Sequence, residues 1–377
     1  YQKIKEVFDK YNKSILESSN EKKVEFIEKD LFLAKIKKDS SYEMFVKNIP
    51  EDIANKLLNL GIRALIINRN KTRVYFEKEL ASKVLGFVGF SENNTNKKTG
   101  LYGLEKYYND VLQKDKVSNK NFFAEVFGDL DEMKNNFKNR ILNNNIKGDL
   151  NLTLEVNVEK YLNNLLQKVK NEWNSEKVGG IVMDLNDGSI IAMEELPTFD
   201  ANDYKSINNI SLFNNNLISS VYEMGSIIKP LTMAAALDKG VVNENTTYND
   251  TGSIMIDTYR ISNFDKTARG PNTGVQQILS QSLNVGIAFL VKELGKESLN
   301  NYFHRFGIGE YTGIDLPGEL SGLTSNLTTN IMVDSVTAGF GQGIAITPIQ
   351  TIRALATLGN GGKLISPHIV RSITYEN

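Results

Sequence analysis

The sequence places a serine and a lysine three residues apart at the predicted start of a helix. The Ala- and Leu-rich segment from Ser226 to Gly240 predicts that helix, because Pro230 is tolerated only near a helix start and Gly240 suits a helix end. Ser226 then lies where free backbone N–H groups can stabilise negative charge, and Lys229 lies one turn later on the same face. A lysine acts as a base only when burial or nearby positive charge lowers its pKa from about 10.4. The pair therefore indicates a serine nucleophile with a lysine base.

A second short element, Ser282-Leu-Asn284, lies between two predicted helical stretches, where both polar side chains could point into a cleft. Each element is weak alone. The Ser-x-x-Lys spacing also occurs at Ser19-Asn-Glu-Lys22, and Ser-x-Asn recurs at Ser18, Ser91 and Ser206. On spacing alone, the alternative interpretation is a buried helix with an ordinary N-terminal serine and a solvated lysine.

The composition narrows the chemistry further. The 377 residues contain no cysteine and two histidines, His304 and His368. Disulfides, cysteine nucleophiles and thiolate metal sites are therefore excluded, and a Ser-His-Asp triad or a histidine-rich metal site is hard to assemble. Lys and Arg number 44 against 45 Asp and Glu, so the net charge of −1 gives no basic field for nucleic acid. We expect Ser, Thr or Lys chemistry with no metal and no cofactor.

The remaining pattern predicts an α+β fold, with strands and helices partly segregated. The amphipathic pattern of residues 1–23 predicts a helix, and the Gly- and Asn-rich segments 91–100 and 143–148 predict solvated loops. The alternating segment 179–193, with Asn186-Asp-Gly at its centre, predicts a hairpin with a tight primed turn.

Longer segments accompany the two short elements in a fixed order along the chain. They are Leu85-Gly-Phe-Val-Gly, Gly100-Leu-Tyr-Gly-Leu-Glu-Lys-Tyr-Tyr, Val182-Met-Asp-Leu-Asn-Asp-Gly-Ser-Ile-Ile-Ala-Met, Pro197-Thr-Phe-Asp-Ala-Asn, Phe306-Gly-Ile-Gly-Glu-Tyr-Thr-Gly-Ile-Asp-Leu-Pro-Gly-Glu, Gly339-Phe-Gly-Gln-Gly-Ile-Ala-Ile-Thr-Pro-Ile-Gln and Gly361-Gly-Lys-Leu-Ile-Ser-Pro-His-Ile-Val. In this order, and together with the serine elements, they make the chain resemble the class B penicillin-binding proteins, specifically the peptidoglycan transpeptidases of the cell-division type.

The resemblance implies a domain organisation and a location. Residues 148–377 would form a penicillin-binding, serine β-lactamase-like transpeptidase domain, an antiparallel sheet flanked by helices with a helical subdomain. Residues 1–147 would form an elongated, non-catalytic pedestal, and the change from polar to alternating sequence near Gly148 favours the same boundary. The catalytic domain would lie on the periplasmic side of the inner membrane, with an anchor before Tyr1 and with divisome or other wall-synthesis proteins as partners of the N-terminal domain.

The resemblance also implies an activity and its residues. Ser226 would be the acylated nucleophile and Lys229 its general base in the D,D-transpeptidation of D-Ala-D-Ala stem peptides, and β-lactams would form the same acyl-enzyme. Ser282 would relay a proton to the leaving D-alanine nitrogen, and Asn284 would hold the peptide amide. The residues expected to line the substrate cleft are Tyr222, Glu223 and Gly225.

Two departures from the family pattern leave alternatives open. Met224 stands where the family commonly has proline, and the Lys98-Thr-Gly100 triplet precedes the serine although the family's Lys-Thr-Gly follows it. We interpret that triplet as a chance match in a loop and expect the true motif beyond Asn377, so that the chain is truncated and a fragment ending there has uncertain activity. The alternatives are a non-catalytic scaffold or β-lactam sensor, a D,D-carboxypeptidase, and a β-lactamase, the last disfavoured by the pedestal resemblance.

Overall fold

The computed structural model divides the chain into two compact units, Tyr1–Arg73 and Val74–Asn377. The residues that it describes are 1–16, 25–40, 42–47, 49–68, 72–91, 94–113 and 147–375. The boundary predicted between residues 147 and 148 does not coincide with this division, because residues 74–112 belong to the second compact unit. That boundary stays a prediction about functional domains, and most of the loop predicted at 143–148 lies outside the described residues.

The first unit is a small helical cluster with an aromatic core. Its helices are α1 (Gln2–Leu16), α2 (Lys29–Ile36) and α3 (Glu51–Leu58). Phe8 and Ile53 are buried, and the Phe8 ring stacks on Phe26 at 5.0 Å between centroids. The helix predicted over residues 1–23 is confirmed over Gln2–Leu16, and residues 17–23 lie outside the described residues.

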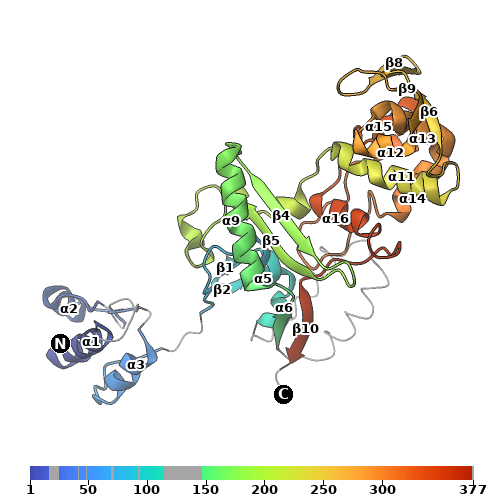
Figure 1. Cartoon of the computed structure of the whole chain (residues 1–377). Coiled ribbons are helices and arrows are strands. Elements are labelled where there is room, and N and C mark those ends of the chain that lie inside the picture. The colour runs from blue at the N-terminus through green and yellow to red at the C-terminus, as the bar shows by residue number, and fades with distance from the viewer. Residues whose placement is uncertain are drawn as a thin grey trace. The chain divides into compact units, whose positions relative to one another are not determined.

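The second unit contains a sheet-bearing part and a helical part (Figure 1). The elements of the sheet-bearing part are α4 (Ser82–Leu85), β1 (Val88–Ser91), β2 (Asn94–Gly100), α5 (Gly103–Tyr107), α6 (Asn109–Leu112), β3 (Gly148–Leu152), α9 (Val156–Glu172), β4 (Val178–Met183), β5 (Ile190–Leu196), α10 (Asn216–Ser219), α16 (Pro348–Ala356) and β10 (Val370–Tyr375). Those of the helical part are α11 (Lys229–Asp238), β6 (Thr247–Asp250), β7 (Ser253–Ile256), β8 (Tyr259–Ser262), β9 (Gly270–Gly274), α12 (Val275–Ser280), α13 (Asn284–Leu294), α14 (Lys296–Arg305) and α15 (Met332–Gly339).

The hairpin predicted at residues 179–193 is confirmed as the antiparallel pair β4–β5, against which α9 packs (Figure 1). Its turn differs from the prediction. The type I′ turn that Asp-Gly favours needs positive φ at both central residues, but only Gly188 has it, with φ of +87°, and Asp187 does not. The register shifts between Val182, which pairs with Ala192, and Met183, which pairs with Ile190, so that β5 carries one extra residue near the turn.

The segment 91–100, predicted to be a loop, is a strand over most of its length. Strand β2 pairs antiparallel with β1, with Lys98 opposite Phe90 and Gly100 opposite Val88. The side chain of Asn109 fastens the strand end, because its Oδ1 accepts hydrogen bonds from Thr99 Oγ1 at 3.0 Å and Gly100 N at 2.8 Å. The prediction of a loop was wrong because it relied on the polar composition of the segment. The strand forms because it pairs with the more apolar strand β1, and not because its own residues favour an extended conformation. The Lys98-Thr-Gly100 triplet therefore belongs to a hairpin of the 74–112 segment.

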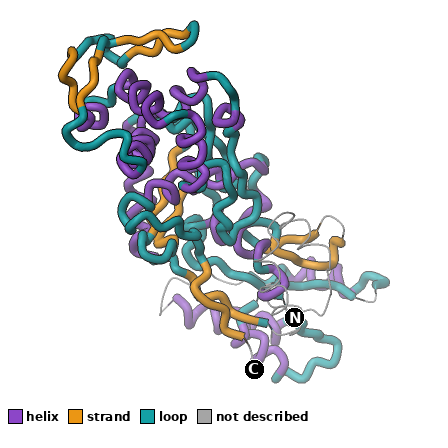
Figure 2. Tube along the Cα trace, turned by 90° about the vertical axis from the view of Figure 1, so that its right-hand side faces the viewer, coloured by secondary structure: helices purple, strands orange, loops and turns teal. Residues whose placement is uncertain are grey.

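The helical part is built on two apolar helices that lie against each other. Helix α13 is buried on nearly all sides, with Ile287, Ala288, Leu290 and Val291 at 0% exposure. It packs against α11 and α15, so that a single cluster of buried side chains joins all three helices. The β6–β9 and β7–β8 ladders lie at one end of this helical part (Figure 2). Close packing fixes the positions of these helices relative to one another, and it therefore also fixes the positions of the residues at their ends.

The start of α4 is joined to β5 through buried charged groups. Ala81 N donates to Glu194 Oε1 at 2.6 Å, and Lys83 Nζ lies 3.0 Å from Glu195 Oε1. Glu159, on α9, faces Glu194 and accepts a hydrogen bond from Met193 N at 3.0 Å. All three glutamates are at most 4% exposed. Glu195 is thus paired with the buried ammonium of Lys83, and Glu194 and Glu159 form a second buried pair beside it.

One carboxyl of the Glu159–Glu194 pair must therefore keep its proton. Burial raises the pKa of both groups, to about 7 for Glu159 and about 8 for Glu194. Glu159 raises the pKa of Glu194 further, whereas the hydrogen bond with Glu194 lowers the pKa of Glu159. Oε2 of Glu159 has no hydrogen-bond partner among the described residues unless Glu194 donates a proton to it. The folded protein then binds a proton that the unfolded chain releases above about pH 4.5, so the free energy of unfolding falls as the pH rises from about 5 to 8.

Replacing Glu194 with glutamine should remove this pH dependence and stabilise the protein at pH 8 by about 1–2 kcal/mol. A glutamine can accept from Ala81 N and donate to Glu159 without needing a proton. Chemical denaturation at pH 5 and pH 8 measures both effects. Glu195→Gln is the matched control, and it should destabilise the protein at both pH values because it leaves Lys83 unpaired. An unchanged pH slope in Glu194→Gln would show that no proton is retained at the pair.

Candidate active site

Ser226 lies in a tight helical turn immediately before α11. Residues Gly225–Ile228 form a 3-10 turn, and α11 begins at Lys229, so the predicted helix over 226–240 is confirmed with a tighter first turn. Gly225 has φ of +62° and donates its N–H to Gly341 O at 2.9 Å. The positive φ of Gly225 favours glycine there, and a Cβ on Gly341 would lie 2.2 Å from Gly225 O, so that position needs glycine too. The close approach of two backbones leaves the Ser226 side chain exposed at the turn.

Lys229 is buried below this turn. Lys229 is only 2% exposed. Its Nζ donates hydrogen bonds to Ser282 O at 2.7 Å and to Ser282 Oγ at 2.9 Å. Burial lowers the pKa of Lys229 to about 8. The solvated lysine considered as an alternative is therefore wrong, and a neutral amine is accessible near physiological pH.

Ser282 connects the lysine to the serine. Its Oγ donates to Ser226 Oγ at 2.9 Å, so the chain of hydrogen bonds runs Lys229, Ser282, Ser226. We expected Lys229 to contact Ser226 directly, but the structure links the two side chains through the Ser282 hydroxyl. Ser282 has φ of +53°, a conformation that costs a residue with a side chain of order 1 kcal/mol. This backbone points the Ser282 carbonyl and hydroxyl at the same amine.

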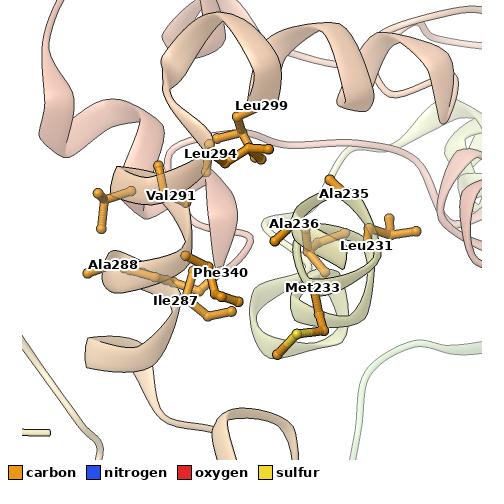
Figure 3. Packing of buried hydrophobic residues seen from close by; sticks show 14 of the residues in the cluster. Leu231, Met233, Ala235, Ala236, Ile287, Ala288, Val291, Leu294, Leu299 and Phe340 are labelled. Atoms are coloured by element: carbon orange, nitrogen blue, oxygen red, sulfur yellow. The ribbon is translucent and has the colours of Figure 1, made fainter. Parts of the chain in front are cut away.

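The packing of α11 on α13 places the two ends of this hydrogen-bond chain. Helices α11 and α13 pack against each other, and Figure 3 shows Ala236 on the side of α11 that faces Ile287 and Val291 of α13. Small residues on α11 let the two helices approach closely, and both sets of side chains are fully buried. Lys229 begins α11 and Ser282 lies two residues before α13, so the interface fixes their separation.

Asn284 is the first residue of α13, and its side chain is already engaged. Nδ2 donates to Ser262 O, at the end of β8, at 2.9 Å. Because this bond fixes the plane of the amide, Oδ1 is left as the acceptor for a ligand N–H. Asn284 is half-buried and belongs to the same turn as Ser282.

The three residues expected to line the cleft hold a glycine-rich loop beside Ser226. Tyr222 pairs with Ile346 through two backbone hydrogen bonds of 3.0 Å, and Glu223 Oε1 accepts from Gly343 N at 2.8 Å. Gly225 bonds to Gly341 of the same loop, as described above. The structure therefore brings Tyr222, Glu223 and Gly225 to the site as residues that position residues 341–346.

An apolar cavity of about 440 Å³ adjoins the turn that carries Ser226. Tyr222, Met224 and Ile227 contribute to its wall, together with residues of β4 and α16. Met224, which stands where the resembling family commonly has proline, thus has a packing role here.

The two histidines lie in other hydrogen-bond networks. His304 Nδ1 is 2.8 Å from Glu310 Oε1, and His368 Nε2 is 3.2 Å from Ser189 Oγ. Asp187 accepts from that same serine, so the Asp187–Ser189–His368 group ties the β4–β5 turn to residue 368. Within the described residues no three His, Cys, Asp or Glu side chains cluster as metal ligands would.

No described helix combines the length and the apolar character that crossing a bilayer requires.

Comparison with known proteins gives a consistent set of matches. The family described as the penicillin-binding protein transpeptidase domain matches residues 178–377. Stage V sporulation protein D of Bacillus subtilis (strain 168) is 30% identical over 368 residues, which cover 95% of this chain and 53% of that protein. Peptidoglycan D,D-transpeptidase FtsI of Escherichia coli (strain K12) is 26% identical over 84% of this chain and 51% of its own length. The chain thus spans about half the length of the curated relatives it matches.

Solved structures share the fold. Penicillin Binding Protein 2X of Streptococcus thermophilus superposes with a TM-score of 0.75 at 21% identity, covering 99% of this chain and 54% of that chain. Penicillin binding protein 3 of Mycobacterium tuberculosis, in a structure complexed with ampicillin, gives a TM-score of 0.66 at 23% identity, covering 82% of this chain and 64% of that chain.

Proposed function

Because the chain belongs to the penicillin-binding protein transpeptidase family, we propose that it contributes the nucleophile of a serine D,D-transpeptidase that cross-links peptidoglycan. The family assignment is the one predicted from the sequence. The observation that carries the activity is the hydrogen-bond chain from buried Lys229 through Ser282 to exposed Ser226.

The proposed reaction begins with transfer of a proton away from Ser226. In the structure Lys229 donates to Ser282 and Ser282 donates to Ser226, so Ser226 Oγ is the acceptor at the end of the chain. When the amine is neutral the chain can reverse, and the Ser226 proton passes through Ser282 Oγ to Lys229 Nζ. Ser226 Oγ then attacks the carbonyl carbon of the penultimate D-alanine of a stem peptide.

The remaining steps return the enzyme to its starting state. The tetrahedral oxyanion lies near the Ser226 N–H, one of the amides at the start of a helical turn that lack an acceptor within the turn. Collapse of the intermediate breaks the peptide C–N bond, and the leaving D-alanine nitrogen takes the proton from Lys229 through Ser282. An amine of a second stem peptide then attacks the ester, forms the new amide bond and regenerates the Ser226 hydroxyl.

The other site residues have proposed roles in holding the donor peptide. Asn284 Oδ1 accepts from a backbone N–H of that peptide, since Ser262 occupies its Nδ2. Glu223 and Tyr222 keep the loop of residues 341–346 beside the nucleophile and form part of the cleft wall.

The full-length protein should turn over a D-Ala-D-Ala donor peptide only in the presence of an acceptor amine. The measurement is mass spectrometry of products with and without a D-amino acid or a stem peptide as acceptor. Exchange of the terminal D-alanine supports the transpeptidase, and release of D-alanine by water at an equal rate would identify a D,D-carboxypeptidase. A protein that forms neither product and no penicillin adduct would be a scaffold. A protein that forms the penicillin adduct but neither product would be a β-lactam sensor. Rapid hydrolysis of penicillin would identify a β-lactamase.

The same family assignment supports a proposal about location and partners. We propose that the catalytic domain works on the extracytoplasmic side of the inner membrane, held by an anchor and by wall-synthesis proteins that contact the N-terminal unit. The cell-division role remains the first proposal. A role in sporulation is the second, because the Bacillus subtilis relative named for a sporulation stage is 30% identical across nearly the whole chain. Depletion in the source organism separates them, since one causes filamentous cells and the other loss of resistant spores.

A further inference from the structure

The turn that carries Ser282 is held by a buried asparagine that belongs to a different part of the helical region. Asn263 follows β8 and is 2% exposed. Its Oδ1 accepts a hydrogen bond from Val285 N at 3.1 Å, in the first turn of α13. The preceding residue, Ser262, accepts from Asn284 through its carbonyl. The last residue of β8 and the residue that follows it therefore hold two consecutive residues at the start of α13.

The orientation of the Asn263 amide is fixed by an aspartate. Asp250, at the end of β6, is fully buried, and both of its carboxylate oxygens accept from Asn263 Nδ2 at 3.0 Å. A carboxylate can only accept, so the NH₂ group of Asn263 must face Asp250. Its carbonyl oxygen must then face Val285 N. Asp250 is oriented in turn, because Oδ1 accepts from Gly252 N at 2.8 Å.

We propose that Asn263, oriented by Asp250, is a positioning residue for the Ser282 turn and so sets the rate of serine acylation. The proposal rests on the proposed function for its kinetic consequence. Ser282 has φ of +53°, and its hydroxyl and carbonyl are both partners of Lys229 Nζ. A turn in this conformation returns to an ordinary one unless its surroundings hold it. Asn263 stabilises the turn by accepting a hydrogen bond from Val285 N, three residues after Ser282.

We expect the loss of the Asn263 side chain to slow the acylation step and to leave the non-covalent binding of penicillin nearly unchanged. Neither Asn263 nor Asp250 belongs to the exposed cleft, so a ligand can dock whether or not they are present. A shift of Ser282 by a fraction of an ångström instead breaks the alignment of the relay between Ser226 and Lys229. Misplacement of about 1 Å can cost about 100-fold in rate. Asn263→Ala should therefore lower the acylation rate constant about 10- to 100-fold and leave the dissociation constant of the non-covalent penicillin complex within about threefold.

A charge swap provides the sharpest test of the pairing. Asn263→Asp places two carboxylates face to face and should lose acylation most strongly. Adding Asp250→Asn should restore it to within about fivefold, because the new amide at position 250 would then donate to the new carboxylate at position 263, which still accepts from Val285 N. Stopped-flow or quenched labelling with a fluorescent penicillin gives the rate constant and the dissociation constant separately.

Asn215→Ala is the matched control. Asn215 is also a buried asparagine, and its Oδ1 accepts from Leu217 N at 3.1 Å, in α10 and away from the Ser282 turn. Its loss should lower the melting temperature by a similar amount and leave the acylation rate constant within about twofold. Equal acylation by Asn263→Ala and Asn215→Ala at matched stability would overturn the proposal, as would a double variant no faster than Asn263→Asp.

Amide hydrogen exchange provides a readout that needs no reaction. Peptides spanning residues 282–287 should exchange at least about tenfold faster in Asn263→Ala than in Asn215→Ala or the unaltered protein, because Val285 N–H loses its acceptor. If the unaltered protein is not acylated, the proposed function fails and exchange alone decides the positioning role. Unchanged exchange in Asn263→Ala would overturn the positioning role whatever the acylation result.

Discussion

Replacing Ser226 with alanine should abolish covalent labelling of the full-length protein by penicillin, a loss of at least about 10⁴-fold in acylation rate. The variant lacks the oxygen that forms the ester, and neighbouring groups cannot substitute for it. Ser282 Oγ is the nearest other hydroxyl, 2.9 Å away, but it lies between Lys229 and Ser226 in the relay. Intact-protein mass spectrometry after incubation with penicillin gives the result directly.

Ser19→Ala is the matched control for this experiment. Ser19 begins the chain's other Ser-x-x-Lys sequence, so it tests whether spacing alone confers reactivity. The control should label like the unaltered protein. Ser226→Ala should keep its melting temperature within about 2 °C, since the residue is exposed. Labelling that persists in Ser226→Ala would move the nucleophile elsewhere and remove the basis of the proposed mechanism.

The sequence predicted the elements that depend on local pattern. Alternating β-branched residues around Asn186-Asp-Gly gave the β4–β5 hairpin, and Pro230 with Gly240 bounded α11 correctly. These features succeed because their periodicity and turn chemistry are encoded within about 15 residues. The same reasoning failed for β2, whose polar residues are extended because β1 lies beside them.

The geometry of the site depended on contacts between distant segments. The spacing of Ser226 and Lys229 predicted their proximity but not the mediating hydroxyl, which comes from residue 282 and requires a left-handed backbone. Nothing local to Asn263 or Asp250 points to the site, because both act through buried hydrogen bonds between segments far apart in the sequence. The glycine-rich sequence after residue 338 was the pattern that could have indicated the loop supporting Gly225.

Lys229→Met should lower the acylation rate by about 10³-fold or more, because the side chain that accepts the Ser226 proton is lost. Methionine has a similar length and suits an apolar site, so the variant should fold. Lys229→Arg is the matched variant that keeps the positive charge but cannot release a proton near neutral pH. If the amine acts as a base, both variants are slow. If it acts only through its charge, the arginine variant retains much of the rate.

The pH profile of the unaltered protein provides an independent test of the same role. Burial lowers the pKa of Lys229 to about 8, and only the neutral amine can take the Ser226 proton. The acylation rate should therefore rise about tenfold per pH unit from pH 6 and level off above about 8. Both Lys229 variants should lose this rise. A flat profile between pH 6 and 9 in the unaltered protein, or the same rise in Lys229→Met, would mean that another group accepts the proton and that the buried amine serves only to hold Ser282 in place.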